Sequence, residues 1–182
     1  MKDFIFAVAL FAALPLCAQE IVVAHDFDPL PVSERTHLVT VTGVYKCQGL
    51  TNGQISRSVL QALALEGYAA TYADDNKIIA HIARLFTYGG GAQEVCFVFV
   101  ADIQDGRVRL SADHIRSERV PNVSSTGWGY AEEWTENRSN GVKMPNERER
   151  FRLQSFAANA IDCIKQLQET IALYIVQPTE QW

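Results

Sequence analysis

The stretch that decides the fold is Val95 to Arg116, which reads VCFVFVADIQDGRVRLSADHIR. It holds two runs of alternating apolar and polar residues, joined by Asp105-Gly106, and this dipeptide is a strong signal for a two-residue hairpin turn. A type I′ turn needs positive φ at both central residues, a conformation that Gly adopts freely and Asp tolerates. The sequence therefore predicts an antiparallel β-hairpin with its turn at these two residues.

The turn sets the register of the two strands. We expect one largely apolar face made by the pairs Gln104–Arg107, Ile103–Val108, Ala101–Leu110 and Phe99–Ala112. The other face is mixed and pairs Asp102 with Arg109, Val100 with Ser111 and Val98 with Asp113. The opposite-charge pair across this face contributes roughly 0.2–1 kcal/mol. A slip of one residue would invert both faces, so the pattern specifies the register, and the apolar face must be covered.

Length and charge narrow the class of protein. The chain has 182 residues, is 48% hydrophobic and carries a net charge of -5 with a pI near 5.4. This length supports one domain with a substantial core. The acidic balance argues against a nucleic-acid partner, because neutralising phosphates requires clustered Lys and Arg.

The N-terminal residues 1–18 have the three parts of a secretory signal peptide. Lys2 lies near the start, an apolar run covers residues 4–14, and small residues end the segment at Cys17-Ala18. The apolar run is shorter than the ~20 residues that a membrane-spanning helix needs. We expect cleavage before Gln19, export to the periplasm or the extracellular space, and no stable membrane span afterwards.

The cysteines leave two questions open. Acylation of Cys17 would make the chain a lipoprotein, although Leu16 is not the small residue that such sites favour before the cysteine. Cys47, Cys96 and Cys163 allow at most one internal disulfide in the mature chain. Their spacing matches no metal or redox motif, so we interpret all three as small buried apolar residues.

Hydrophobic periodicity and capping signals predict the remaining elements. Thr51 and Gln54 have the spacing of a helix capping box, and Asn146 with Glu149 opens a second helix in the same way. The predicted segments are an extended lead-in at 19–36, a strand at 37–45, a helix at 51–67, strands at 68–73 and 77–86, the hairpin, a long loop at 117–145 and a helix ending before Pro178. The fold class is α+β: an antiparallel sheet of about five strands in β-α-β-β-β-β-α order, with both helices on one face, within a single domain over residues 37–177.

The chain resembles the DUF4468 family, exported bacterial domains of unknown function with a TATA-binding-protein-like fold. The likeness lies in the first strand leading into a helix, in Asp75 to Ala80 (DNKIIA) and in Asp105 to Leu110 (DGRVRL). It covers roughly His37 to Val176. It implies this fold and export in Bacteroidetes-like bacteria, and it brings no catalytic residues. It does not imply DNA binding, because this chain is acidic.

The second face of the sheet is the candidate binding surface, since helices on one face leave the other open to solvent. The candidate residues are Thr40, Thr42, Arg109, Ser111 and Asp113, with Trp128 and Trp134 from the long loop at the rim. The two tryptophans have a second interpretation, which we favour: they pin the loop to the domain by burying large side chains. The open face itself has the alternative of being merely solvated.

Three functions fit these residues. The first is a non-enzymatic module that binds an unidentified protein or small-molecule partner in the cell envelope, and the second is a structural accessory subunit of an envelope assembly. The third is a hydrolase that uses His81 or His114 with Asp113. We expect no enzyme activity, because adjacent strand residues point to opposite faces and no nucleophile motif is present. We also expect no cofactor and no metal site; His25, Asp26 and Asp28 suggest a solvated arm.

Overall fold

The structure, a computed structural model, describes residue 33 and residues 38–89, 91–118, 129–131, 134, 138–139, 142–143 and 146–176. The predicted signal peptide, Cys17 and almost all of the predicted lead-in lie outside the described residues, and so does Trp128.

The predicted hairpin is present as β4 (Gly91–Gln104) and β5 (Arg107–Glu118). Asp105 has φ 50° and Gly106 has φ 68°, as a type I′ turn requires. The register from the turn to Val98 is the predicted one, and Arg109 donates to Asp102 at 2.8 Å across it. One part of the prediction was wrong. Gln104 and Arg107 are exposed and share the parity of Asp102 and Arg109, so this pair lies on the mixed face.

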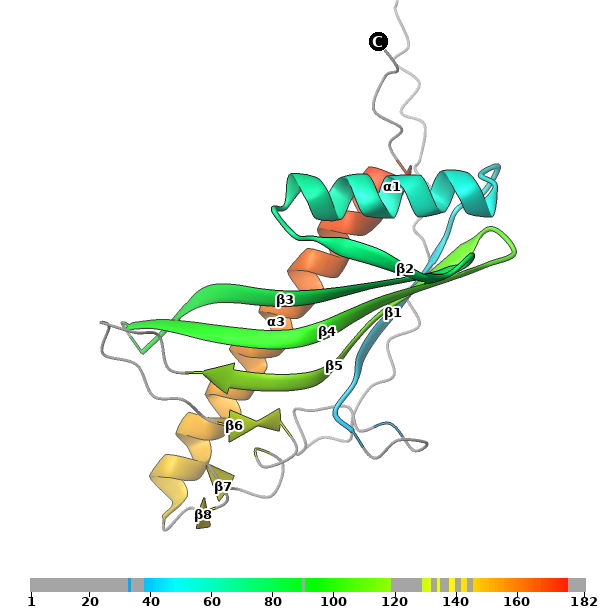
Figure 1. Cartoon of the computed structure of the whole chain (residues 1–182). Helices are drawn as coiled ribbons and strands as arrows, with labels where there is room; N and C mark the ends of the chain where they lie inside the picture. Colours follow the sequence, from blue (N-terminus) through cyan, green and yellow to red (C-terminus); the bar gives the residue numbers. More distant parts are fainter. Residues whose placement is uncertain are drawn as a thin grey trace, which may run out of the picture.

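The hairpin is the centre of a larger antiparallel sheet with the order β1-β5-β4-β3-β2 (Figure 1). The other strands of this path are β1 (Val41–Lys46), β2 (Ala70–Asp74) and β3 (Lys77–Tyr88). Gly91 pairs with Tyr88, so β4 begins before Val95, where the predicted hairpin starts. A sixth strand, β6 (Gly129–Tyr130), pairs with the far end of β5. The short strands β7 (Arg138–Ser139) and β8 (Val142–Lys143) form a separate pair.

Two helices cover one face of the sheet, as predicted (Figure 1). They are α1 (Asn52–Leu65) and α3 (Glu147–Val176). The capping box predicted at Thr51 and Gln54 is present at the start of α1. Gly67, with φ 85°, follows the end of this helix, where the chain turns toward β2.

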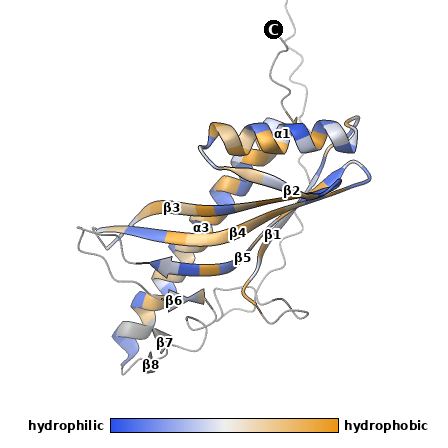
Figure 2. Cartoon of the chain, in the orientation of Figure 1, coloured by the Kyte–Doolittle hydropathy of each residue, from blue (hydrophilic) through white to orange (hydrophobic). Residues whose placement is uncertain are grey.

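The core lies between the helices and the alternate strand residues that face them. Phe99 and Leu110 from the hairpin are fully buried, as are Leu63 of α1 and Phe156 of α3. Figure 2 shows that the middle of β3 and β4 is largely hydrophobic, whereas the β4–β5 turn is hydrophilic. Phe156 also has a neighbouring ring at 5.0 Å, that of Trp134, which is only 3% exposed. This contact agrees with the pinning interpretation of Trp134.

One buried polar side chain links α3 to the sheet. Gln168 is 2% exposed, and its Nε2 donates to the carbonyl of Val41 at 3.0 Å and to that of Leu110 at 3.1 Å. These carbonyls belong to β1 and β5, so one carboxamide joins the helix to the two strands at this side of the sheet. Among the residues that the structure describes, no helix covers the remaining face, which is the candidate site.

Candidate interaction surface

We use the name open face for the side of the sheet that points away from α1 and α3. In β1, β3, β4 and β5 its residues alternate with buried ones, and they are half-buried or exposed. Four of the predicted binding residues lie close together on it. Thr42 pairs with Ser111 across β1 and β5, and Arg109 and Asp113 follow on either side of Ser111 along β5. Thr40, next to the start of β1, is half-buried.

Trp134, one of the two predicted tryptophans, does not extend this surface. Trp134 is buried against Phe156 at an interplanar angle of 86°, so its ring is not available to a ligand. Its inclusion among the binding residues was therefore wrong, because burying a large apolar ring in the core is more favourable in free energy than leaving it exposed to solvent. Trp128 lies outside the described residues.

The end of the open face next to the β4–β5 turn, here called the turn end, carries charged residues of both signs. Lys46 and Arg107 are exposed there, and Arg109 has a side chain that is 59% exposed. Asp102 contacts both Arg109, at 2.8 Å, and Lys77, at 3.5 Å. One carboxylate thus bridges two cations, and Asp74 lies opposite Lys77 in the strand register. The acidic residues in the turns, Asp74, Asp75 and Asp105, lie at the rim of this end.

A shallow depression of about 450 Å³ borders the turn end. Residues 46–50 and 105–107 line it, where the loop after β1 meets the hairpin turn. It is open to solvent, and Lys46 and Arg107 are its basic residues. Within the described residues, none of the buried side-chain atoms without a hydrogen-bond partner belongs to its lining. Asp105 also lines it, and it defines no separate ligand site among the described residues.

A β-bulge interrupts β5 on the other side of the open face. The register shifts by one residue between Val98 and Cys96, and His114 has φ 50°, which is unusual for a residue other than Gly. The bulge turns His114 out of the strand alternation, and its Nδ1 lies 2.8 Å from a carboxylate oxygen of Asp113. The prediction that these neighbours point to opposite faces was therefore wrong, because it assumed an unbroken strand.

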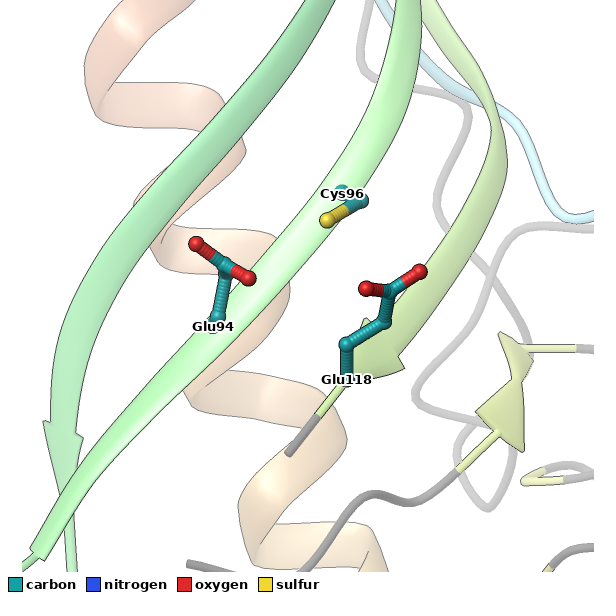
Figure 3. A group of neighbouring side chains, drawn as sticks. All are labelled: Glu94, Cys96 and Glu118. Carbon is teal, nitrogen blue, oxygen red and sulfur yellow. The ribbon is translucent and has the colours of Figure 1, made fainter. Parts of the chain in front are cut away.

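Beyond the bulge, three metal-ligand side chains come together on the open face (Figure 3). The ligand atoms of Glu94, Cys96 and Glu118 all lie within 4.8 Å of one another. Arg116 is part of the same group, and its Nε donates to Glu118 at 2.7 Å. We call this region the bulge end; with Asp113 it contains three carboxylates and one arginine, so it is mainly anionic.

The thiol of Cys96 is electrostatically coupled to this group. Partial burial raises its pKa, and the nearby charges of Glu94 and Glu118 raise it further, against a smaller lowering by Arg116. The pKa of Arg116 is itself raised, chiefly by Glu118. Cys96 is half-buried and not in the core, so the prediction that all three cysteines are buried was wrong for this one. None of the three forms a disulfide within the described part of the chain, and Cys47 and Cys163 are buried as predicted.

A thiol with two carboxylates is a ligand set that Zn²⁺ accepts. Here Arg116 already supplies positive charge to Glu118, and the thiol pKa is raised rather than lowered. The arrangement is thus satisfied as an ion-pair network, and we assign no metal chemistry to it. His81, the other candidate for acid–base chemistry, is separated from Asp113 in the strand register by Val98 on β4.

Between its two charged ends the open face has an apolar band. Ile79 of β3 and Val98 and Val100 of β4 are half-buried on it. Val44 of β1 is also half-buried, but it lies opposite Arg109 at the turn end. Leu85, at 62% exposure, continues this apolar surface toward the bulge end. Tyr130 of β6, which is 50% exposed, lies opposite Arg116 at the bulge end, on the other edge of the sheet from Leu85. The band is the part of the open face that gains most from being covered.

The sequence did not indicate the bulge end as a cluster, and the bulge is the reason. Continuing the register of the turn would place Cys96 opposite Ile115 and Glu94 opposite Ser117. The observed pairs are Cys96 with Arg116 and Glu94 with Glu118. The only local signal was an Asp-His pair at the end of an alternating run, which is common in ordinary strands.

Comparisons with known proteins agree with this architecture. No family model and no curated protein matches the sequence. Among solved structures, a TBP-like protein from Parabacteroides distasonis ATCC 8503 aligns with a TM-score of 0.62 at 12% identity, over 81% of this chain and 97% of that one. A DUF4468 family protein from Bacteroides ovatus ATCC 8483 aligns with a TM-score of 0.59 at 13% identity, over 85% of this chain and 94% of that one.

These alignments define the class of protein: an α+β domain with the TBP-like fold. The chain shares this fold with the DUF4468 protein, which confirms the resemblance predicted from the sequence at the level of the fold. Within the described residues, no helix is both long enough and apolar enough to cross a membrane.

Proposed function

We propose that this chain is an exported, non-enzymatic interaction module that binds a protein partner in the cell envelope through the open face. The observation that carries the proposal is the composition of that face. The half-buried side chains of Ile79, Val98 and Val100 form an apolar centre. Charged residues lie on both sides of it, with Arg109 and Asp102 toward the turn and Arg116 and Glu118 beyond the bulge. An apolar centre with a charged rim is the usual composition of a protein interface.

The signal-peptide pattern of residues 1–18 supports the envelope as the place of action. The described cations of the open face have carboxylates beside them, as Lys77 has Asp102. Together with the net charge of -5, this disfavours binding to the phosphates of a nucleic acid.

The chemistry of the titratable groups supports a role without catalysis. The Asp113–His114 pair is exposed to solvent, with side-chain exposures of 30% and 61%. Catalytic acid–base pairs depend on a shielded site and a nucleophile or substrate held beside them. On this face of β5, the hydroxyl nearest to the Asp113–His114 pair belongs to Ser111. Its Oγ donates to the carbonyl of Val100 at 3.5 Å and not to the histidine.

A structural accessory subunit of an envelope assembly is the second candidate. The apolar band favours it, because a half-buried patch of valine and isoleucine is stabilised by permanent cover more than by brief contacts. The two candidates share one surface and differ in how long it stays covered.

A pull-down from an envelope fraction tests the surface. The bait is the chain from Gln19 carrying Arg109→Glu with Asp113→Lys, which inverts the charge pattern of the open face and keeps the net charge. A matched control, Arg152→Glu with Asp162→Lys, inverts two exposed charges on α3. We expect proteins recovered with the wild type and the control to be lost with the open-face variant. An identical set of proteins with all three baits would refute the proposal.

A further inference from the structure

The apolar band of the open face lies close to the point where the N-terminal segment joins the sheet. Ile79, Val98 and Val100 form the band on β3 and β4, and all three are half-buried. The N-terminal segment joins at Ser33, whose backbone N–H donates to the carbonyl of Leu38 at 2.9 Å, shortly before β1. Since β1 is at one end of the strand order β1-β5-β4-β3-β2, the chain before Ser33 leaves from an edge of the sheet.

The lead-in is long enough to cross from this edge to the apolar band. Three strand spacings of ~4.8 Å separate β1 from β3, which makes about 14 Å. Six residues in an extended polyproline conformation span about 19 Å. Residues 27–32 can therefore reach from Ser33 across β5 and β4 as far as β3.

The prolines of the lead-in disfavour pairing with the free edge of β1. In an extended strand, alternate residues direct their backbone N–H groups to the same side. The N–H of Ser33 points to Leu38, so the N–H groups of residues 31 and 29 would also face β1. Both residues are proline and have no N–H, so a strand added along β1 would lack two consecutive donors. Docking on a face through side chains needs no such donors.

The apolar residues of the same segment fit the open face. Residues 27–32 read FDPLPV, and Phe27, Leu30 and Val32 are stabilised by leaving water. The helix side of β1 is already filled, because Val39 and Val41 are 0% and 2% exposed there. The half-buried apolar band lies on the other side of the sheet. Proline-rich segments bind such surfaces well, because their extended conformation is preformed and loses little entropy.

We propose that residues 27–32 lie across the open face and cover its apolar band. The inference rests on the proposed function, because it assigns a regulator to the same surface: a protein partner must displace this segment before it binds. The connection through Ser33 makes the contact intramolecular, so no second molecule loses its translational freedom, and a small apolar area is enough for cover. The lead-in is then an autoinhibitory segment of the interaction module.

A cysteine placed in the apolar band reports whether the band is covered. The reporter is Val98→Cys with Cys96→Ser, in the chain from Gln19, and the two remaining thiols, Cys47 and Cys163, are buried. In the native protein, maleimide should label the reporter at a rate proportional to the fraction of molecules in which the segment is displaced.

Two double substitutions in the lead-in separate the covering residues from their neighbours. Phe27→Asp with Leu30→Asp places charges against the apolar band. We expect labelling about fivefold faster or more, as the displaced fraction rises from about a fifth to nearly all molecules. Val22→Asp with Val23→Asp makes the same chemical change outside residues 27–32 and should leave the rate unchanged. If circular dichroism shows that the first variant has not folded, Phe27→Ser with Leu30→Ser replaces it with the same expectation.

Two outcomes would overturn residues 27–32 as the cover. One is an equal labelling rate with and without the Phe27 and Leu30 substitutions. A fast common rate would mean that the face is uncovered, and a slow one that another part of the chain or a second copy covers it. The other outcome is an equal rise with both double substitutions.

The pull-down separates this inference from the proposed function. With the Phe27 and Leu30 variant as bait, we expect larger amounts of the proteins that the wild type recovers. If labelling rises but the Arg109 and Asp113 variant still recovers every protein, the cover stands and the proposed function fails. If labelling is unchanged and that variant loses its proteins, the proposed function stands and the cover is refuted.

Discussion

Replacing Gly106 with Ala tests the turn on which the sheet register depends. Gly106 has φ 68°, and a Cβ built there would lie 3.6 Å from the carbonyl oxygen of Cys47, which is an ordinary contact. The cost is therefore conformational rather than steric, at about 1–2 kcal/mol for a left-handed residue other than Gly. Ala also reduces the conformational entropy of the unfolded chain, which offsets about 0.4–1 kcal/mol of this cost. The expected net loss of stability is about 1 kcal/mol.

Gly53 offers the matched control for the same chemical change. It lies in the first turn of α1, is exposed, and a Cβ there meets nothing within 4 Å. Helical backbone suits Ala, so Gly53→Ala should stabilise the domain by about 0.5–1 kcal/mol. The two substitutions thus have opposite signs and differ by about 1.5–2 kcal/mol.

Urea denaturation followed by far-UV circular dichroism measures both variants, with each free energy taken at an unchanged m-value. Gly106→Ala should lower the unfolding midpoint and Gly53→Ala should raise it. If Gly106→Ala equals or exceeds the wild type in stability, the positive φ at this residue is wrong, and with it the type I′ turn.

Three further predictions concern the core and the open face. Phe156→Ala should cost about 3–5 kcal/mol in chemical denaturation, because it removes a fully buried ring, and the near-UV circular dichroism of the packed Trp134 should weaken. Gln168→Leu keeps the volume and removes the donor to two backbone carbonyls, so it should cost about 1–3 kcal/mol. In the native chain from Gln19, maleimide should modify Cys96 first, since the other thiols are buried. Its rate should rise with pH, and Glu118→Gln should increase it at pH 8 by lowering the thiol pKa.

Each of these has a contrary result. An unchanged midpoint for Phe156→Ala would mean that the ring is not in the core, and Phe151→Ala, an exposed ring on the same helix, is its control. Wild-type stability for Gln168→Leu would show that the two carbonyls are satisfied without the carboxamide. Equal maleimide rates with and without Glu118→Gln at pH 8 would separate Cys96 from the charge of that carboxylate.

The fold was predictable because its signals are local. Asp105-Gly106 specifies a turn, and the turn fixes the register outward as long as each strand residue opposes one partner. Thr51 and Gln54 specify the start of α1 through side-chain bonds within one helical turn. The bonds from Gln168 to the strands span 127 and 58 residues, and no local pattern could indicate them.

The candidate site was predictable only as far as the bulge. Thr42, Arg109, Ser111 and Asp113 follow from the turn by alternation, and the structure places them on one face. Beyond Asp113 the register is displaced by one residue, so the alternation that predicts the first half of the face gives the wrong partners for the second half. A bulge depends on φ at one residue, and His is only moderately favoured in that conformation.

The same displacement gives the open face its polarity. With an unbroken register, Glu94 would oppose Ser117, and Glu118 would point toward the helices with its charge buried, at a cost of several kcal/mol. The bulge at His114 returns Arg116 and Glu118 to the solvent side, where they pair at 2.7 Å beside Glu94. The anionic end of the face therefore depends on this one inserted residue.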